Sequence, residues 1–116
     1  MYGNTAFYVQ NDGAYHTSDK KFKDNIEDIS KEDIDKLFST DNGFIREFDW
    51  KENNKHSIGV IAQEIEEFIP EAVDIENDTR TVNYDVALSK LVGCLFKKIK
   101  EQEKRIEYLE SKMKTE

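Results

Sequence analysis

The sequence is poor in the residues that build disulfides, metal sites and phosphate-binding loops. Its 116 residues contain one cysteine, Cys94, one proline and five scattered glycines. A single cysteine excludes an internal disulfide framework and a zinc site made of several cysteines, and scattered glycines exclude a glycine-rich phosphate loop. No apolar run approaches the roughly 20 residues of a membrane span, and no secretory signal pattern follows Met1. The sequence therefore predicts no cofactor and no membrane partner.

Basic residues are in short supply relative to acidic ones. The chain has 17 Lys and Arg against 25 Asp and Glu, a formal net charge of -8, and its sequence pI is near 4.8. Because non-specific binding to a phosphate backbone depends on clustered Lys and Arg, nucleic acid is not an expected partner. His16 and His56 lie far apart without metal-binding spacing, and the acidic residues do not follow the calcium-loop pattern. We therefore expect no metal site.

The chain does contain many charged residues and a normal supply of aromatic ones. Charged residues make up 36%, hydrophobic residues 37%, and the mean hydropathy is -0.79. Seven Phe, five Tyr and one Trp argue against disorder, because disordered chains are poor in aromatics. A chain this short and this charged forms only a marginal core by itself. The composition therefore favours a small domain that associates with copies of itself.

Local patterns before residue 44 predict short elements of both types. The triplet Asn11-Asp12-Gly13 is a turn signal between two stretches that read as strands. Further on, Ser30 begins a pattern that resembles a capping box, and Ile34, Leu37 and Phe38 then fall on one helical face. The expected elements are a hairpin with strands Ala6–Gln10 and Ala14–Thr17, and a helix over 31–39.

Residues 44–84 are expected to carry most of the core. Phe44, Phe48 and Trp50 indicate an extended segment, and the β-branched run 58–61 indicates another. Helical spacing then appears, and the only proline, Pro70, ends it. The remaining expected elements are a helix over Ala62–Phe68 and a hairpin with strands 72–75 and 81–84 around Asn77-Asp78.

Residues 85–116 carry a sustained heptad repeat. Positions a (92, 99, 106 and 113) and d (88, 95, 102 and 109) are apolar except for Gln102. In a parallel neighbour, the g-position Lys98 and Arg105 would face the e-position Glu103 and Glu110, so the flanking charges favour a parallel homo-oligomer. The thiol of Cys94, at a c position, is expected to be structural. Together these patterns predict an α+β fold that ends in a long coiled-coil helix.

A serine and a lysine near the start of the charged zone could support covalent chemistry. A lysine amine that loses its proton can act as the base for a serine nucleophile, and Ser18 precedes Lys23 by five residues. That spacing puts the two side chains on different sides of a helix or a strand. Ser18 and Lys23 could therefore meet only across a turn or between subunits, and a solvated basic turn is the alternative interpretation.

Several strings of the chain resemble one family in the same order. Ser18–Ile26 is similar to the opening motif of the intramolecular chaperone auto-processing domain that closes bacteriophage tailspikes, tail fibres and endosialidases. Lys21 stands where that family usually has arginine, which keeps the charge but loses the bidentate fork. The later strings that resemble the family are Phe48-Asp49-Trp50, Ile58–Ile65 (IGVIAQEI), Phe68–Val73 (FIPEAV) and Val82-Asn83-Tyr84.

The resemblance implies a trimerising chaperone that removes itself by self-cleavage. It implies cleavage of the Thr17–Ser18 bond, with Ser18 as nucleophile and Lys23 as base. It also implies supporting roles for Asp19 and Asn25 near the pair, and structural, subunit-contact or supporting roles for Gln63 and Glu64. An intertwined homotrimer is expected from the resemblance, although Ile at a with Leu at d favours two-stranded coils.

The resemblance also implies how the chain is divided into parts and where it acts. The expected parts are residues 1–17 as the end of an upstream fibre, 18–84 as the globular chaperone part and 85–116 as the trimeric coiled coil. The expected partners are copies of the chain itself and the fibre upstream. Assembly would take place in the host cytoplasm, with the fibre in the virion tail and this domain released. Two alternatives stay open: a non-cleaving trimerisation module, and a virion adaptor that binds through Tyr2, Phe7, Tyr8 and Tyr15.

Overall fold

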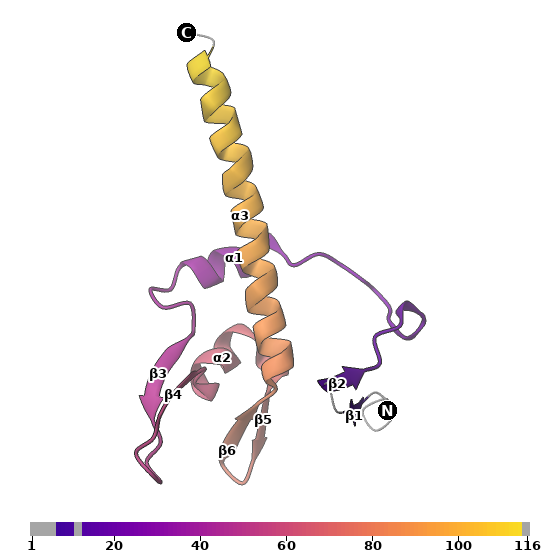
Figure 1. Ribbon diagram of the computed structural model, residues 1–116, viewed down its shortest axis with the longest axis vertical. Coiled ribbons are helices and arrows are strands. Elements are labelled where there is room, and N and C mark those ends of the chain that lie inside the picture. Colours follow the sequence, from indigo (N-terminus) through magenta and orange to yellow (C-terminus); the bar gives the residue numbers. More distant parts are fainter. Residues whose placement is uncertain (1–6, 11–12, 115–116) are drawn as a thin grey trace.

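The fold combines short antiparallel hairpins, two short α-helices and one long helix (Figure 1). The computed structural model describes residues 7–10 and 13–114, with side chains from residue 17 onward. The molecule is elongated, with extents of 63 × 42 × 30 Å, because the long C-terminal helix projects from the globular part. The α+β prediction is confirmed. The elements are β1 (Phe7–Gln10), β2 (Gly13–His16), η1 (Lys20–Phe22), α1 (Lys31–Phe38), β3 (Arg46–Asp49), β4 (His56–Gly59), α2 (Ala62–Phe68), η2 (Pro70–Ala72), β5 (Val73–Glu76), β6 (Thr79–Val82) and α3 (Tyr84–Lys114).

Each strand pairs only with its sequence neighbour, which gives three separate two-stranded sheets in the described part of the chain. In the β5–β6 hairpin, Glu76 pairs with Thr79, so Asn77 and Asp78 form the two-residue loop. Both loop residues have a positive φ, 52° and 62°. Loops of this length require left-handed residues, and Asn and Asp tolerate that conformation better than other side-chain-bearing residues. The predicted hairpin turn is therefore confirmed.

The predicted strand boundaries are shifted by one or two residues, and two of these errors have a clear local cause. Tyr84 was expected to end a strand but begins α3, because Asn83 caps that helix: its Oδ1 accepts a hydrogen bond from Val86 N at 3.2 Å. Ala72 was expected to begin a strand but lies in η2, where its amide donates to the Ile69 carbonyl at 2.9 Å. In both places the residue types favour a strand, but a local hydrogen bond in a helix cap or a turn determines the observed structure.

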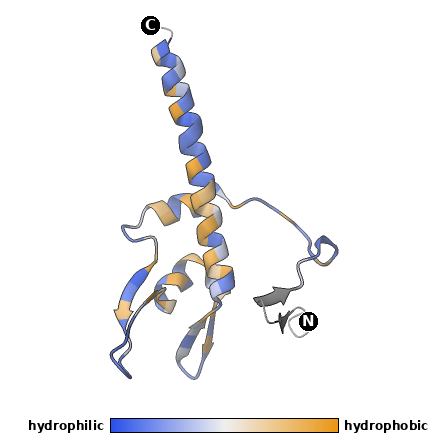
Figure 2. Ribbon diagram, in the orientation of Figure 1, coloured by the Kyte–Doolittle hydropathy of each residue, from blue (hydrophilic) through white to orange (hydrophobic). Residues whose placement is uncertain are grey.

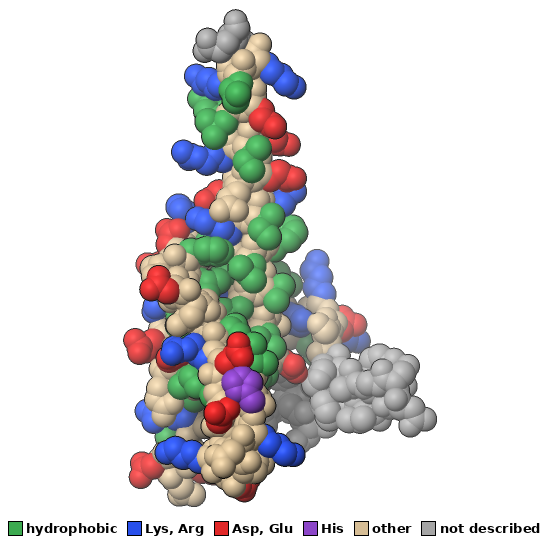
Figure 3. All heavy atoms as spheres, turned by 60° about the vertical axis from the view of Figure 1, so that its left-hand side comes forward, with side chains coloured by type: hydrophobic (Ala, Val, Ile, Leu, Met, Phe, Trp, Pro, Cys, Tyr) green, Lys and Arg blue, Asp and Glu red, His purple; other side chains and the backbone are tan. Residues whose placement is uncertain are grey.

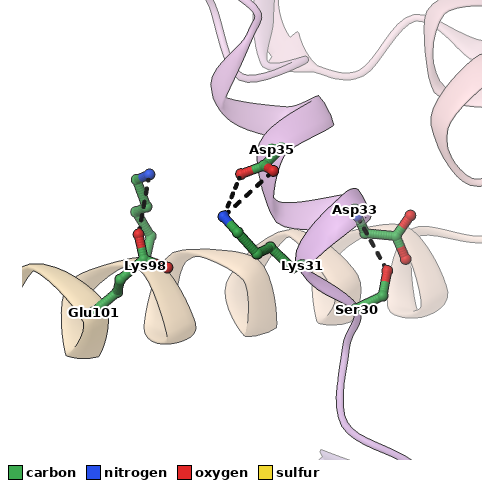
Figure 4. A network of polar contacts seen from close by, with 6 residues as sticks. All are labelled: Ser30, Lys31, Asp33, Asp35, Lys98 and Glu101. Atoms are coloured by element: carbon green, nitrogen blue, oxygen red, sulfur yellow. Dashed lines mark hydrogen bonds and ion pairs between the residues drawn. The ribbon is translucent and has the colours of Figure 1, made fainter.

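Helix α1 begins as its sequence predicts. The Ser30 hydroxyl accepts a hydrogen bond from Asp33 N at 3.1 Å, and Lys31 pairs with Asp35 one turn on (Figure 4). Ile34 and Leu37 are buried, whereas Phe38 lies at the edge of the buried face and is 43% exposed. The helix is thus held by its cap and by two core residues, and it leaves one aromatic ring partly open to solvent.

The core lies between α1, α2, η2 and the first turns of α3. The strands contribute less to it than the sequence predicted, because the β3–β4 and β5–β6 hairpins extend beyond the helices (Figure 1). Trp50, expected in the core segment, is 55% exposed and packs edge-on against Phe48 at 5.0 Å between ring centroids. The buried hydrophobic residues are Ile34, Leu37, Val60, Ile65, Phe68, Ile69, Ala72, Ala87, Leu91 and Cys94.

Helix α3 runs unbroken from Tyr84 to Lys114, so the predicted long helix is confirmed over the described residues. Only Ala87, Leu91 and Cys94 of this helix are buried. The heptad residues lie on another face and are exposed, and apolar turns alternate with polar ones along the helix (Figure 2). We call these residues the stripe: Leu88, Val92, Leu95, Ile99, Gln102, Ile106, Leu109 and Met113.

Two glycines allow close packing against the helix. A Cβ atom on Gly59 would stand 2.7 Å from the Tyr84 hydroxyl oxygen, and the neighbouring Val60 amide donates to that oxygen at 3.3 Å. A Cβ atom on Gly93 would overlap the side chain of Ile29. Ile29 ends the segment that we call the arm, residues 17–29. Gly93 therefore provides the place where the arm packs on α3.

Candidate functional site

The Ser18 and Lys23 side chains lie together at the outer end of the arm. Lys23 Nζ donates a hydrogen bond to Ser18 Oγ at 2.7 Å. Both side chains are exposed, as is Thr17, which precedes the serine. Of the two arrangements that the spacing allowed, a turn within one chain is the one observed here.

A single 3-10 turn brings the two side chains together. The carboxylate of Asp19 caps this turn by accepting a hydrogen bond from Lys21 N at 2.9 Å. The amide of Phe22 then donates to the Asp19 carbonyl, and the amide of Lys23 donates to the Lys20 carbonyl, each at 3.0 Å. A tight turn reverses the chain within a few residues, so residues five apart can face each other, which they cannot do in a regular helix or strand. Asp19 thus holds the turn that aligns the pair.

Asn25 redirects the chain after the turn. Its φ is 55°, in the left-handed region that Asn adopts more readily than most residues with side chains. The chain then runs back toward α3, where the Lys97 ammonium pairs with Asp28 at 3.0 Å. Lys21, at the position where arginine was expected, has its ammonium 5.3 Å from the centroid of the Phe22 ring.

An open groove separates the arm from the first turns of α3. Thr17 and Lys23 line its outer side, and Leu88 and Val92 of the stripe line the side formed by the helix. At its inner end the arm contacts α3 through Ile29 against Gly93 and through the ion pair of Asp28 with Lys97. Thr17, Lys23 and the N-terminal end of the stripe therefore border the same open space.

The other two predicted supporting residues lie elsewhere. Gln63 and Glu64 are in the first turn of α2, and within the described residues no hydrogen bond or ion pair joins them to Ser18 or Lys23. Gln63 is exposed. Glu64 Oε2 accepts from Arg46 Nη1 at 2.7 Å and so ties α2 to β3, whereas its Oε1 is buried without a partner. Gln63 and Glu64 therefore do not contact the Ser–Lys pair of the same chain, and their roles stay predictions.

Sequence reasoning missed a charged cluster on the β3–β4 hairpin. His56 Nε2 lies 2.7 Å from Glu47 Oε1, and His56 Nδ1 lies 2.8 Å from Asp49 Oδ1. These hydrogen bonds raise the pKa of His56, the one to Glu47 more than the one to Asp49, because both favour the imidazolium. Asp49 and His56 pair across the hairpin, so the sequence would have indicated this cluster if the register of the two strands had been known.

The single thiol is part of the core. Cys94 is fully buried between α3 and the globular part. Burial raises its pKa, and the nearby Asp33 carboxylate adds to that effect, so the thiol form is favoured. The expectation of a structural thiol agrees with this environment.

The described part of the chain holds neither a group of metal ligands nor a membrane-spanning helix. No group of three or more described His, Cys, Asp or Glu side chains is arranged so that it could hold a metal ion. Within the same residues, helices long enough to cross a bilayer are not apolar enough to do so.

The fold and the candidate site together indicate a class of protein. The chain is an α+β domain with an exposed Ser–Lys pair at its outer end and a long helix whose apolar stripe is uncovered. Residues 18–74 match the model of a peptidase family described as the chaperone of endosialidase, so this segment is similar to that family. The resemblance noted from the sequence is therefore confirmed. No curated protein matches the chain.

Proposed function

We propose that the chain is an intramolecular chaperone that trimerises, aligns a fibre upstream of it and then releases itself by cutting the Thr17–Ser18 bond. The observation that carries this proposal is the 2.7 Å hydrogen bond from Lys23 Nζ to Ser18 Oγ. The family match begins at Ser18, which agrees with a domain that starts at the bond to be cut. The partners in this proposal are copies of the chain and its own upstream fibre.

The proposed reaction uses two steps on the chain's own backbone. Neutral Lys23 Nζ takes the proton of Ser18 Oγ as this oxygen attacks the Thr17 carbonyl carbon. The bond from that carbon to the Ser18 nitrogen breaks, the nitrogen takes up a proton, and an ester joins the Thr17 acyl group to Ser18 Oγ. Water then hydrolyses the ester, which leaves a carboxylate on Thr17 and the free hydroxyl of Ser18. Each chain turns over once, so no separate substrate pocket is needed.

Assembly would supply the conditions for this reaction. A lysine amine in open water holds its proton, and only its neutral form can act as a base. A neighbouring copy that packed on Leu88 and Val92 would fill the groove beside Lys23, and removal of water favours the neutral amine. Cleavage would then follow trimerisation, and loss of the trimerising part would leave the fibre kinetically trapped.

The stripe supports self-association. Its seven apolar residues are all exposed in the single chain, and an exposed apolar face of this length marks an interaction surface. The charges beside it are complementary for a parallel neighbour, since Lys98 and Arg105 would meet Glu103 and Glu110. The polar Gln102 at a d position weakens the sequence preference for two strands, and the resemblance to the family implies three chains.

The experiment that tests cleavage is mass analysis of the purified chain after incubation. The proposal predicts a fragment that begins at Ser18, and Ser18→Ala and Lys23→Met variants that stay intact. Ser111→Ala is the matched control, because Ser111 is another exposed serine and lies far along α3. An intact wild-type trimer would instead favour the non-cleaving trimerisation module, and cleavage in Ser18→Ala would contradict the assignment of the nucleophile.

Asp19 is proposed as a positioning residue for the pair. Asp19→Ala removes the oxygen that accepts from Lys21 N, and loss of such a cap costs about 1 kcal/mol of local stability. We therefore expect cleavage to slow roughly fivefold in Asp19→Ala and to stay near the wild-type rate in Asp19→Asn, because Asn caps equally well. If both variants lose cleavage equally, the carboxylate acts through its charge and the positioning role is wrong.

The adaptor alternative depends on aromatic residues at the start of the chain. The side chains of Tyr2, Phe7, Tyr8 and Tyr15 lie outside the described residues. In our proposal they belong to the end of the fibre, assembly takes place in the host cytoplasm, the fibre joins the virion tail and this domain is released. A pull-down of a virion protein by a stable, uncleaved trimer would favour the adaptor instead.

A further inference from the structure

Phe96 is an aromatic residue that has no place in a simple coiled coil. It occupies an e position of the heptad, and its side chain is 61% exposed. In the next two heptads the e positions hold Glu103 and Glu110, as expected for residues at the edge of a coiled-coil interface. A large apolar side chain at such a position points to an apolar partner.

An apolar groove lies on the opposite flank of the same stripe. It has a volume of about 440 Å³ and lies between α3 and the segment that contains α1 and the loop after it. Phe38 and Ile45 line it from α1 and the loop after it. The lining residues from α3 are the g-position Leu91 and three residues of the stripe, Leu88, Val92 and Leu95. Figure 3 shows hydrophobic side chains at the surface where α3 meets the globular part. The groove is thus continuous with the stripe.

The heptad register brings Phe96 and this groove together between copies. In a parallel coil each g residue faces the e residue five positions later on the neighbour. That spacing pairs Lys98 with Glu103 and Arg105 with Glu110, and one heptad earlier it pairs Leu91 with Phe96. The g and e positions at the edge of the proposed interface are therefore charged in the later heptads and apolar in the heptad beside α1.

We infer that Phe96 of one copy inserts into the groove formed by Phe38, Ile45 and Leu91 of the next copy. This inference rests on the proposed self-association and assigns part of its interface to the globular region. The groove exists only when α1 and the following loop are packed on α3. Association through Phe96 thus depends on a folded globular part, so that only correctly folded chains trimerise tightly.

Analytical ultracentrifugation of the full chain, made uncleavable by Ser18→Ala, tests this inference. Phe96→Ala and Phe38→Ala are each expected to weaken association roughly tenfold or more, because each removes a ring from a buried contact. Tyr108→Ala is the matched control, since Tyr108 is 59% exposed on the same helix but lies at a c position away from the interface. This variant is expected to associate like the parent.

The variant that carries both Phe96→Ala and Phe38→Ala tests whether the two rings contact each other or weaken association independently. If the two rings touch across copies, Phe96→Ala and Phe38→Ala together weaken association by much less than the product of the single effects. Full additivity, or a Phe96→Ala variant that associates like Tyr108→Ala, would overturn the inference while the proposed trimer stands. A parent that sediments as a monomer would overturn the proposed assembly and this inference together. Circular dichroism confirms that each variant is folded, and Ile45→Ala replaces Phe38→Ala if the latter is not.

Discussion

The two halves of α3 differ in what they contact. Up to Cys94 the helix buries Ala87, Leu91 and Cys94 against the globular part, while its stripe residues on another face are exposed. From residue 101 to 114 every side chain is exposed. A helix in a protein gains most of its stability when its apolar face packs against another element. The apolar residues of the second half have no such packing within the described chain. In the proposed assembly, the first half would contact both the globular part and other copies, and the second half would contact only other copies.

Replacing each of two nearby leucines with alanine should give the largest change in stability. The pair distinguishes the buried face of the first half from its exposed stripe. Leu91 is 5% exposed and Leu88 is 42% exposed, three residues away. We expect Leu91→Ala to lower the free energy of unfolding by about 2–5 kcal/mol, as for other buried leucines, and Leu88→Ala to act mainly on self-association. Urea denaturation at a concentration where the chain is monomeric measures the first effect. Equal losses in both variants would contradict the assignment of two faces.

A charge in the second half should dissociate the copies without unfolding the chain. Ile106→Asp puts a carboxylate at an a position, where a neighbour would bury it, and burial of an unpaired charge is strongly unfavourable. Tyr108→Asp places the same charge two residues away at a c position. Light scattering is expected to give a monomer for the first variant and the parent's mass for the second. Identical masses for both would mean that the stripe is not the interface.

A methyl group at Gly93 should displace the arm from the helix. Alanine favours helix by about 1 kcal/mol over glycine, but its Cβ would overlap Ile29, and overpacking costs about 1–3 kcal/mol. We expect little change in helix content and faster amide exchange over residues 24–29 in Gly93→Ala. Ser111→Ala, on the free half of the same helix, serves as control. Unchanged exchange in the arm would show that Ile29 is not held at this position.

The smallest effect is expected from pH at the β3–β4 hairpin, which belongs to neither half of α3. The pKa of His56 is raised in the folded chain, so its imidazolium contributes stability that is fully present below the unfolded pKa and is lost as pH rises through the raised value. NMR titration should show the His56 pKa fall in Glu47→Gln and fall less in Asp49→Asn. Self-association should not follow this titration, and if it does, the hairpin is part of the interface.

Periodic and capping signals predicted much of the fold. The heptad predicted α3, Ser30 predicted the start of α1, and Asn77-Asp78 predicted the β5–β6 turn, because each depends on residues close in sequence. The exposure of Trp50 was not predictable in this way, since burial depends on which distant elements cover a strand.

The candidate site was predicted by residue type and not by geometry. Spacing alone left Ser18 and Lys23 on different sides of any regular element, and it is the Asp19-capped 3-10 turn that brings them within hydrogen-bonding distance. The ion pair of Glu64 with Arg46 and the contact of Gly59 with Tyr84 join segments far apart in the sequence. A motif marks such residues without stating what they touch, because that depends on tertiary packing.

In the proposed mechanism, assembly switches on cleavage before Ser18. The most direct measurement is the mass spectrum of the purified chain after incubation at concentrations below and above its self-association midpoint. The account predicts a fragment that begins at Ser18, formed at a rate that follows the trimer fraction and absent in Ile106→Asp. An intact chain where the protein is fully trimeric, or equal cleavage of the monomer, would contradict it.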